Sequence, residues 1–351
     1  MSQDGIAVPT GFATSAQLFR DFLSQNDLDE AIKQHLQAYS TGDKSLPLTG
    51  YTIRQLINQG TFTSSQKLEI ITAYRQLSKQ LGQENMSVAV RSSATAEDLP
   101  EASFAGQQES YLNIVGEANL LKACRNCFAS LYTDRAIVYR QEQGFEHQQV
   151  ALSVGVQQML NAHCAGVMFS IDTETGFPDV VVINGAWGLG ETIVKGTVTP
   201  DSFMVYKPLL SQTHLLPIIE KQRGSKRQKM LFSPSSHQPT ITVDTSADER
   251  AALVLSDNEI LLLARWAVNI EQHYGCAMDM EWAKDTDTQQ LYIVQARPET
   301  VESQKIGSVL VNYQLKEKST VLVQGASVGS AIATGKVFRI DSPKDIEQFP
   351  D

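Results

Sequence analysis

The sequence lacks any long apolar run. No segment approaches the roughly 18 consecutive apolar residues that a membrane-spanning helix requires. The first residues, Met1 to Gly5, have neither the positive charges nor the apolar stretch of a secretory signal. We therefore expect a cytoplasmic protein with no membrane partner.

Positive charge is also scarce. The chain of 351 residues has 29 Lys and Arg against 39 Asp and Glu, a formal net charge of -10. Binding to a nucleic-acid backbone needs a concentrated positive surface, so nucleic acid is not an expected partner, whereas a local basic site for a small anion stays open. Because a single hydrophobic core stops growing at roughly 250 to 300 residues, we expect two to three structural units.

Cysteine is too rare for a disulfide framework. Of the four cysteines only Cys124 and Cys127 are close, and they lie inside a helical pattern with no second ligand pair or histidine nearby. A redox pair or half of a zinc site is the alternative, but buried core cysteines are favoured.

Against these absences, one stretch has the composition of an anion site. The apolar run from Val88 to Val90 ends in Arg91 and two serines, and a loop of small residues around Gly106 follows. Arginine offers five fixed N–H donors, and small residues let backbone N–H groups approach phosphate oxygens. We interpret the stretch as a phosphate site of a nucleotide; the alternative is a surface turn with one ion-paired arginine.

Apolar spacing predicts a mixture of helices and strands. In the strand expected over 150–159, alternation places Gln157 on the face opposite Val154 and Val156, where it could point into a site. A capping box of Thr14 and Gln17 is expected to open the first helix. Further helices are expected over 28–39, 53–58, 65–81 and 119–140, and further strands over 109–114, 166–170 and 179–184.

A predicted hairpin over residues 277–298 contains a second cluster of polar side chains. Two alternating runs, 277–283 and 291–298, flank a polar turn. The period of two places Gln295 and Arg297 on one face, with Glu281 on the neighbouring strand. Oxygen ligands suit magnesium, and an arginine suits the charge that develops in phosphoryl transfer. The alternative is a surface salt bridge between Glu281 and Arg297, which only the hairpin register decides.

Two further segments have ordinary interpretations. Trp187 to Glu191 is a glycine-rich turn that lacks the end of a P-loop, so a tight strand connection is favoured over a phosphate loop. A basic cluster in a polar region is interpreted as a solvated loop face, with cover for an anionic ligand as the alternative. The cluster consists of Lys221, Arg223, Lys226, Arg227 and Lys229.

Together the motifs closely resemble the phosphoenolpyruvate synthase (pyruvate, water dikinase) family. The resemblance lies in Val88 to Gln108, Trp187 to Glu191, Asp279 to Trp282 and Ile293 to Thr300, and it runs from about Gly5 to the C-terminus. It concerns the family's N-terminal ATP-binding domain, which pyruvate phosphate dikinase and rifampicin phosphotransferase share.

The resemblance implies an α/β (α+β) fold of the ATP-grasp type. Two subdomains are expected at residues 1–195 and 196–303, followed at 304–351 by a linker and the start of a swivelling phosphohistidine domain. It also implies an enzyme that uses ATP and Mg2+, transfers the β-phosphoryl group of ATP to a histidine of the swivelling domain, and passes it on to pyruvate.

Site residues follow from the resemblance position by position. Arg91 and Arg297 look like the two phosphate arginines and the catalytic residues. Gly106 and Ser110 look like loop contacts to the phosphates, and Gln157 like a contact near the base or ribose. Glu281 and Gln295 look like the magnesium ligands.

The sequence departs from the family's pattern in segments outside these motifs. The family's Gly-Gly-Lys segment precedes the equivalent of Gly5, and neither the acceptor histidine nor the pyruvate-binding barrel is found in this sequence. We therefore expect one part of a split or truncated synthase, incomplete for turnover alone, with a separate chain carrying the remaining domains and a homodimer both compatible with it. A nucleotide-binding remnant without turnover and a fragment of a related dikinase or rifampicin phosphotransferase are the alternatives.

Overall fold

A computed structural model describes most of the chain. The described residues are 5–95, 98–99, 102–103, 109–212, 214–233 and 239–300, with the short pieces 320–322, 334–336 and 338–339. Gly106 and most of 304–351 lie outside them, so neither the small-residue loop nor the expected start of a phosphohistidine domain is described.

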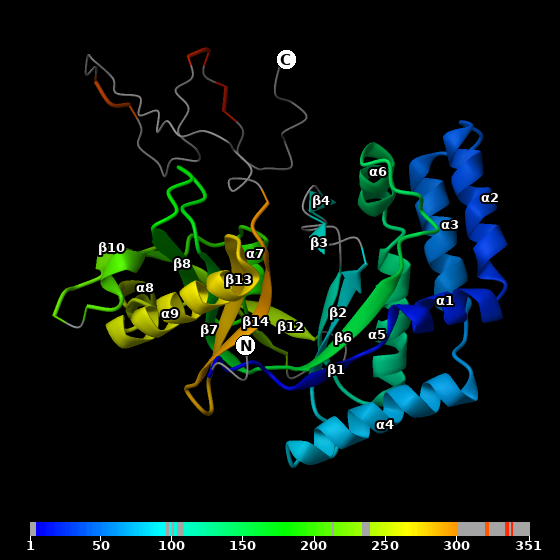
Figure 1. Ribbon diagram of the computed structural model, residues 1–351, viewed down its shortest axis with the longest axis horizontal. Coiled ribbons are helices and arrows are strands. Elements are labelled where there is room, and N and C mark those ends of the chain that lie inside the picture. The colour runs from blue at the N-terminus through cyan, green and yellow to red at the C-terminus, as the bar shows by residue number, and fades with distance from the viewer. Residues whose placement is uncertain are drawn as a thin grey trace.

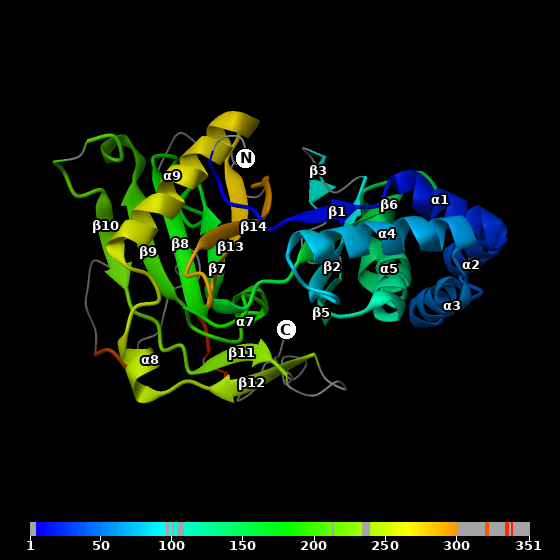
Figure 2. The same ribbon diagram turned by 90° about the horizontal axis from the view of Figure 1, so that it is seen from below.

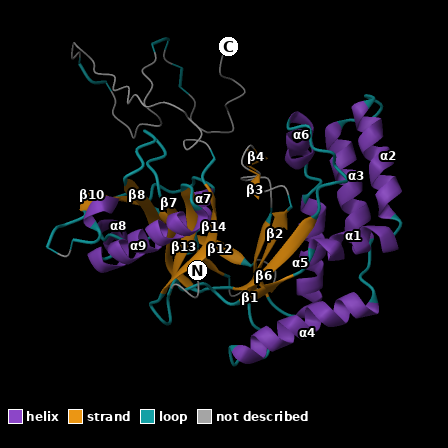
Figure 3. Cartoon of the chain, in the orientation of Figure 1, coloured by secondary structure: helices purple, strands orange, loops and turns teal. Residues whose placement is uncertain are grey.

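Helices and strands alternate irregularly along the chain (Figure 3). The helices are α1 (Ala16–Gln25), α2 (Leu28–Ser40), α3 (Leu46–Gln59), α4 (Ser64–Gln80), α5 (Glu117–Ser130), α6 (Asp134–Glu142), α7 (Glu191–Val194), α8 (Ala247–Ala251) and α9 (Asp257–Tyr274), with a 3-10 helix η2 (Lys207–Leu209). The strands are β1 (Gly11–Ala13), β2 (Val88–Ala94), β3 (Asp98–Leu99), β4 (Ala102–Ser103), β5 (Ser110–Ile114), β6 (Leu152–Gln158), β7 (Ala162–Phe169), β8 (Val180–Trp187), β9 (Asp201–Tyr206), β10 (Ile218–Gln222), β11 (Gln228–Phe232), β12 (Thr240–Asp244), β13 (Met278–Asp285) and β14 (Leu291–Pro298).

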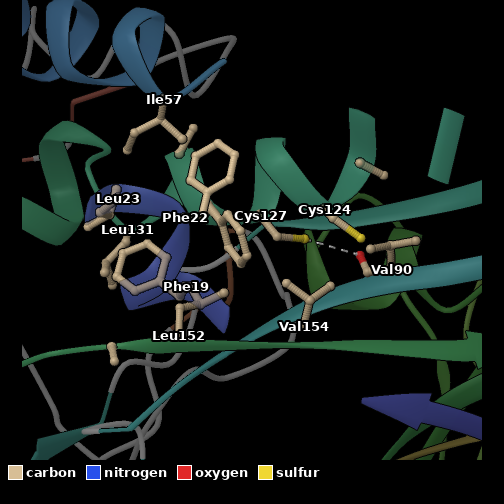
Figure 4. Close-up of a cluster of buried hydrophobic side chains, with 14 of the residues drawn as sticks. Phe19, Phe22, Leu23, Ile57, Val90, Cys124, Cys127, Leu131, Leu152 and Val154 are labelled. Atoms are coloured by element: carbon tan, nitrogen blue, oxygen red, sulfur yellow. Dashed lines mark hydrogen bonds between the residues drawn. The ribbon is translucent and has the colours of Figure 1, made fainter. Parts of the chain in front are cut away.

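The first sheet has four antiparallel strands in the order β1-β6-β2-β5, with helices against one face (Figure 1). Alternate valines of β2 and β6 point into the core beneath these helices: Val90 and Val154 are fully buried. They share this core with aromatic rings of α1 and α5, among which Phe19 and Phe128 stack edge to face with centroids 5.2 Å apart. Figure 4 shows Phe19 and Phe22 of α1 in this core with Val90 and Val154. The period of two along β2 therefore supplies one wall of a helix-covered core.

The cysteines expected in the core are there. Cys124 and Cys127 on α5 are fully buried in the first core, and the Cys127 Sγ lies 3.9 Å from the Val90 carbonyl oxygen (Figure 4). Burial raises the pKa of the Cys124 thiol to about 12. Both side chains therefore act as small apolar groups and not as reactive thiols.

The second sheet has six strands in the order β10-β9-β8-β7-β13-β14. Helix α9 covers one of its faces, and the hairpin of β11 and β12 lies beyond the opposite face (Figure 2). The core under α9 contains Ile260, Leu263 and Ala267 of the helix with Met280 and Trp282 of the sheet. A smaller cluster on the opposite face joins Leu160, Ala165, Leu189 and Ala283.

The chain passes between the two sheets more than once. Ile6 is buried in the second core, and the Ala7 carbonyl accepts from the Ile293 amide of β14 at 2.9 Å, whereas Gly11 in β1 pairs with Gln157 in the first sheet. The boundary expected at 195 falls within the second sheet's elements, because β7 and β8 pair with β13 and β9. The described residues thus form a mixture of α and β with two large antiparallel sheets, each covered by helices on one face, and two small two-stranded sheets, β11-β12 and β3-β4.

Most elements predicted from the sequence are present, with three corrections. The single helix expected over 119–140 is two helices, because the Thr133 hydroxyl caps a new helix by accepting from the Ala136 amide, and Arg54 donates to the Tyr132 carbonyl between them. The first helix is capped by Ser15 and not by a Thr14 box. Helix α3 starts at Leu46, well before the expected residue 53, because the proline that follows Leu46 lies in the first turn, where its missing N–H removes no helical hydrogen bond.

Among the described residues, no helix combines the length and the hydropathy needed to cross a membrane.

Candidate functional site

A cavity of about 630 Å³ lies between the two sheets. The first sheet contributes Arg91, Ser110 and Gln157, and the second contributes Gly166, Glu281 and Val294. Most of the polar strand residues in the lining, such as Arg91 and Glu281, lie on the strand face opposite the helix-covered core, since side chains alternate across a strand. The cavity is thus lined by residues of both sheets.

Arg91 lines this cavity and connects the two sheets. Its Nη1 donates to Glu281 Oε2 at 3.1 Å and to Gln295 Oε1 at 2.8 Å. The side chains of Arg91 and Glu281 are 25% and 26% exposed, so both are reachable from the cavity. The structure thus brings together three of the residues that the sequence analysis selected from two distant motifs.

The hairpin of β13 and β14 explains why Glu281 and Gln295 converge. These two residues are direct partners in the antiparallel register, and an irregularity follows between Glu281 and Trp282. Side chains directly opposite each other share one face of a sheet and lie close together. Their two oxygens therefore meet at one point, where the Arg91 guanidinium lies.

Arg297 has a different partner from the one considered in the sequence analysis. It faces Asp279 in the register, and its Nε and Nη2 donate to Asp279 Oδ2 at 2.8 and 2.6 Å. Burial raises the pKa of Asp279, and Arg297 opposes the rise. The alternative of a Glu281–Arg297 salt bridge is therefore wrong in this structure, and Arg297 lies beside the cavity without lining it.

Part of the cavity lining is apolar. It consists of Met159, Leu160, Ala165, Leu189 and Val294, which belong to the small cluster on the second sheet. A cavity lined by both apolar and charged groups can accommodate a molecule with a flat apolar part and an anionic part.

Several cavity residues were not selected from the sequence. Leu189, Gly190 and Glu191 come from the glycine-rich turn, and Lys195 pairs with Glu191 at 2.6 Å. Leu189, Gly190 and Glu191 belong to the Trp187 to Glu191 motif, but the glycines of that motif indicated only a tight strand connection and not a cavity wall. That connection is real: Gly188 has a φ of +77°, and a Cβ there would lie 2.3 Å from the Met230 carbonyl oxygen.

Glu109 and Arg135 also line the cavity, and no motif indicated them. Their ion pair is long, with Arg135 Nη2 3.9 Å from Glu109 Oε1. Glu109 directly precedes Ser110, which pairs with Arg91 across β5 and β2. Arg135 lies on α6, and only the helix break after Ser130 positions it.

The basic cluster does not form an anion site. Lys226 is fully buried and pairs with the buried Asp201, while Lys221 and Lys229 pair with Asp257 and Glu249. The interpretation of a wholly solvated loop was wrong for Lys226, because its carboxylate partner comes from the distant strand β9.

The oxygen donors of Glu281 and Gln295 fit a hard divalent cation. The described residues hold no group of three or more His, Cys, Asp or Glu side chains arranged for a metal. Magnesium, however, keeps several waters and commonly binds through one or two carboxylates plus substrate phosphates. One carboxylate and one amide oxygen therefore fit magnesium bound together with phosphates.

Comparison with known proteins identifies the family of the chain. The family described as "Pyruvate phosphate dikinase, AMP/ATP-binding domain" matches residues 1–317. The chain is 49% identical over 349 residues to the phosphoenolpyruvate synthase of Pseudomonas aeruginosa, covering 98% of this chain and 44% of that protein. It is 46% identical over 342 residues to the phosphoenolpyruvate synthase of Escherichia coli, covering 96% of this chain and 43% of that protein.

A more distant relative has the same pattern of coverage. The probable phosphoenolpyruvate synthase of Methanocaldococcus jannaschii is 40% identical over 349 residues, which are 99% of this chain and 28% of that protein. The chain thus spans less than half the length of these relatives. Since the family match covers most of the chain and includes every strand of both sheets, the chain belongs to the pyruvate phosphate dikinase AMP/ATP-binding domain family.

Proposed function

We propose that the chain is the ATP-binding, phosphoryl-donating module of a phosphoenolpyruvate synthase, built as an ATP-grasp-type fold. The observation that carries the proposal is the contact of Arg91 with both Glu281 and Gln295 at a cavity lined by both charged and apolar side chains. An adenine ring fits the apolar part of the lining, and phosphates with a divalent cation fit the charged groups.

Each residue of the site has a role in this proposal. Arg91 and Arg297 bind phosphate oxygens, and Ser110, with Gly106 outside the described residues, contacts the same phosphates. Gln157 lies on the first sheet's side of the cavity, where it reaches the ribose or base. Glu281 and Gln295 would hold Mg2+, which supplies positive charge against the phosphates during transfer.

In the complete enzyme, ATP, pyruvate and water give phosphoenolpyruvate, AMP and phosphate: the β-phosphoryl group of ATP goes to a histidine of a swivelling domain and then to pyruvate, and the γ-phosphoryl group goes to water. The support is the identity to phosphoenolpyruvate synthases that are more than twice as long as the matched region. We assign the subdomains to 1–195 and 196–303, although strands β7 and β8 at the end of the first range belong to the six-stranded sheet of the second. We assign the start of the swivelling domain to 304–351.

Calorimetric titration of the purified chain with Mg-ATP tests the binding step. We expect the wild-type chain to bind, and Arg91→Met to weaken binding at least about tenfold, because a charge-assisted contact is lost. Arg75→Met is the matched control, since Arg75 pairs with Glu117 on the helical side and does not line the cavity. A wild-type chain that binds no Mg-ATP, or equal affinities of wild type and Arg91→Met, would contradict the proposal.

Phosphoryl transfer needs a second experiment. The chain is mixed with ATP labelled in its β-phosphoryl group, Mg2+ and the separately prepared remainder of a phosphoenolpyruvate synthase. We expect label on the histidine of the added protein and release of AMP. Nucleotide binding without any labelled histidine would leave only a nucleotide-binding module without turnover.

A further inference from the structure

The point between Glu281 and Gln295 is already taken by a cationic group of the chain. Arg91 Nη1 donates to both oxygens at once, at 3.1 and 2.8 Å. These two oxygens are also the ligands that fit a divalent cation, and Glu281 and Gln295 are facing residues of one hairpin. A guanidinium held by both oxygens and a metal bound to both oxygens exclude each other.

We propose that Arg91 is an internal substitute for the divalent cation, and that nucleotide phosphates draw it away and thereby open the metal site. The inference rests on the proposed function for the identity of the anion. It adds a positioning role to Arg91: before nucleotide arrives, the arginine neutralises Glu281 and prevents the binding of free metal.

The N–H groups of Arg91 are not all hydrogen-bonded in this position, which supports its movement toward bound phosphates. Its Nε is buried and has no hydrogen-bond partner in the described part of the chain, so the present position leaves one donor unsatisfied. A buried donor without a partner is unfavourable, and a phosphate oxygen in the cavity can satisfy it. The guanidinium is therefore not held by all of its donors where it lies.

Arg297 shows the contrasting case. Both its Nε and its Nη2 donate to Asp279, its register partner on the neighbouring strand. Arg91 instead reaches its acceptors from the other sheet, across the cavity. Of the two arginines, Arg91 is the one whose displacement frees metal ligands, because only it contacts Glu281 and Gln295.

The consequence is positive coupling between metal and nucleotide. Both metal and nucleotide bind to the state in which Arg91 has left Glu281. When they bind together, the free-energy cost of moving Arg91 away from Glu281 arises once and not twice, so each ligand increases the affinity for the other. Free metal alone has to displace the arginine without any phosphate to receive it, and should bind weakly.

Titration of the full chain with Mn2+ in the absence of nucleotide, followed by electron paramagnetic resonance of the free ion, tests the proposal. We expect Arg91→Met to bind Mn2+ at least about tenfold more tightly than wild type, the equivalent of one charge-assisted hydrogen bond. The same substitution should weaken Mg-ATP binding, so the two affinities move in opposite directions. Adding Glu281→Gln to Arg91→Met should abolish the gain.

Arg135→Met is the charge-matched control. It removes one positive charge from the same cavity, but Arg135 pairs loosely with Glu109 and does not contact Glu281. Its Mn2+ affinity should equal that of wild type. An equal rise in Arg135→Met would show a general charge effect and overturn the proposal, as would equal Mn2+ affinity of wild type and Arg91→Met.

The experiments distinguish failure of the proposed function from failure of the Arg91 proposal. A wild-type chain that binds no Mg-ATP contradicts the function, whereas the Mn2+ comparison without nucleotide still decides the role of Arg91. Circular dichroism and thermal unfolding show whether each variant is folded. If Arg91→Met is unfolded, Arg91→Gln removes the charge with a polar side chain, and the same rise in Mn2+ affinity is expected.

Discussion

Arg91 and Glu281 stand 190 positions apart in the chain and form an ion pair of 3.1 Å between the first and the second sheet. Arg91 follows the buried valines of β2, and Glu281 lies in the middle of β13. The pair joins two sheets that have separate hydrophobic cores. It therefore contributes to the relative position of the two sheets as well as to the site.

The first prediction concerns the stability of this link. A double-mutant cycle with Arg91→Met and Glu281→Gln should give a coupling energy of about 1 to 2 kcal/mol, between the values for exposed pairs and for hydrogen bonds to buried charges. Urea unfolding without nucleotide or metal measures it. A coupling energy indistinguishable from zero would mean that the pair does not stabilise the ligand-free chain.

The second prediction concerns Asp279 and its partner Arg297. Arg297→Met leaves the carboxylate in a partly buried site without its two donors, so it should destabilise the chain at pH 7 by about 3 kcal/mol. Burial already raises the pKa of Asp279, and the loss of Arg297 should raise it further.

The pH dependence of Arg297→Met follows from the direction of that shift. A carboxyl whose pKa is raised in the folded state favours folding where it is protonated, so the variant's deficit should shrink as the pH falls from 7 toward 4. Adding Asp279→Asn should restore much of the stability at pH 7. Urea midpoints of both variants between pH 4 and 7 measure this, and a deficit of constant size would contradict it.

The third prediction concerns the buried pair of Lys226 and Asp201. Both side chains are fully buried, and Asp201 also accepts from the amides of Gly224 and Val254. Lys226→Met should cost about 3 to 5 kcal/mol, because an unpaired carboxylate stays buried. Lys221→Met is the control: its pair with Asp257 is largely exposed and should contribute less than about 1 kcal/mol in the same urea experiment.

The fourth prediction concerns His147 beside a buried arginine. Arg140 is fully buried, and its Nε donates to His147 Nδ1 at 2.9 Å, which requires an unprotonated nitrogen. Burial, with the charge of Arg140, lowers the pKa of His147 to about 4. The unfolded chain therefore binds this proton first, and stability should fall as the pH drops from about 6.5 toward 4.

The variant His147→Gln tests that assignment. Glutamine keeps an acceptor for Arg140 without a titrating nitrogen, so thermal unfolding temperatures should lose part of their decline between pH 6.5 and 4. Arg140 Nη1 would keep its bond to the Leu131 carbonyl in both proteins. An unchanged pH profile would show that other groups are responsible for the acid sensitivity.

Much of the local structure could be predicted from the sequence, because it depends on spacing. Alternating valines indicated β2 and β6, the paired alternating runs indicated the hairpin of β13 and β14, and the two cysteines in a helical pattern indicated buried side chains. Residue types alone placed Arg91 in a charged site, and with the family resemblance they related Glu281 and Gln295 to it. These inferences need only near neighbours in the chain.

The tertiary structure decided the partners. A two-residue shift in register would place Glu281 opposite Arg297 instead of Asp279, and spacing within a strand does not encode the register between strands. The burial of Lys226, the break before α6 that positions Arg135, and the contact of Arg91 with the second sheet all depend on residues far away in the chain. The sequence determined which chemical groups the site contains, and the packing of two sheets determined which of them touch.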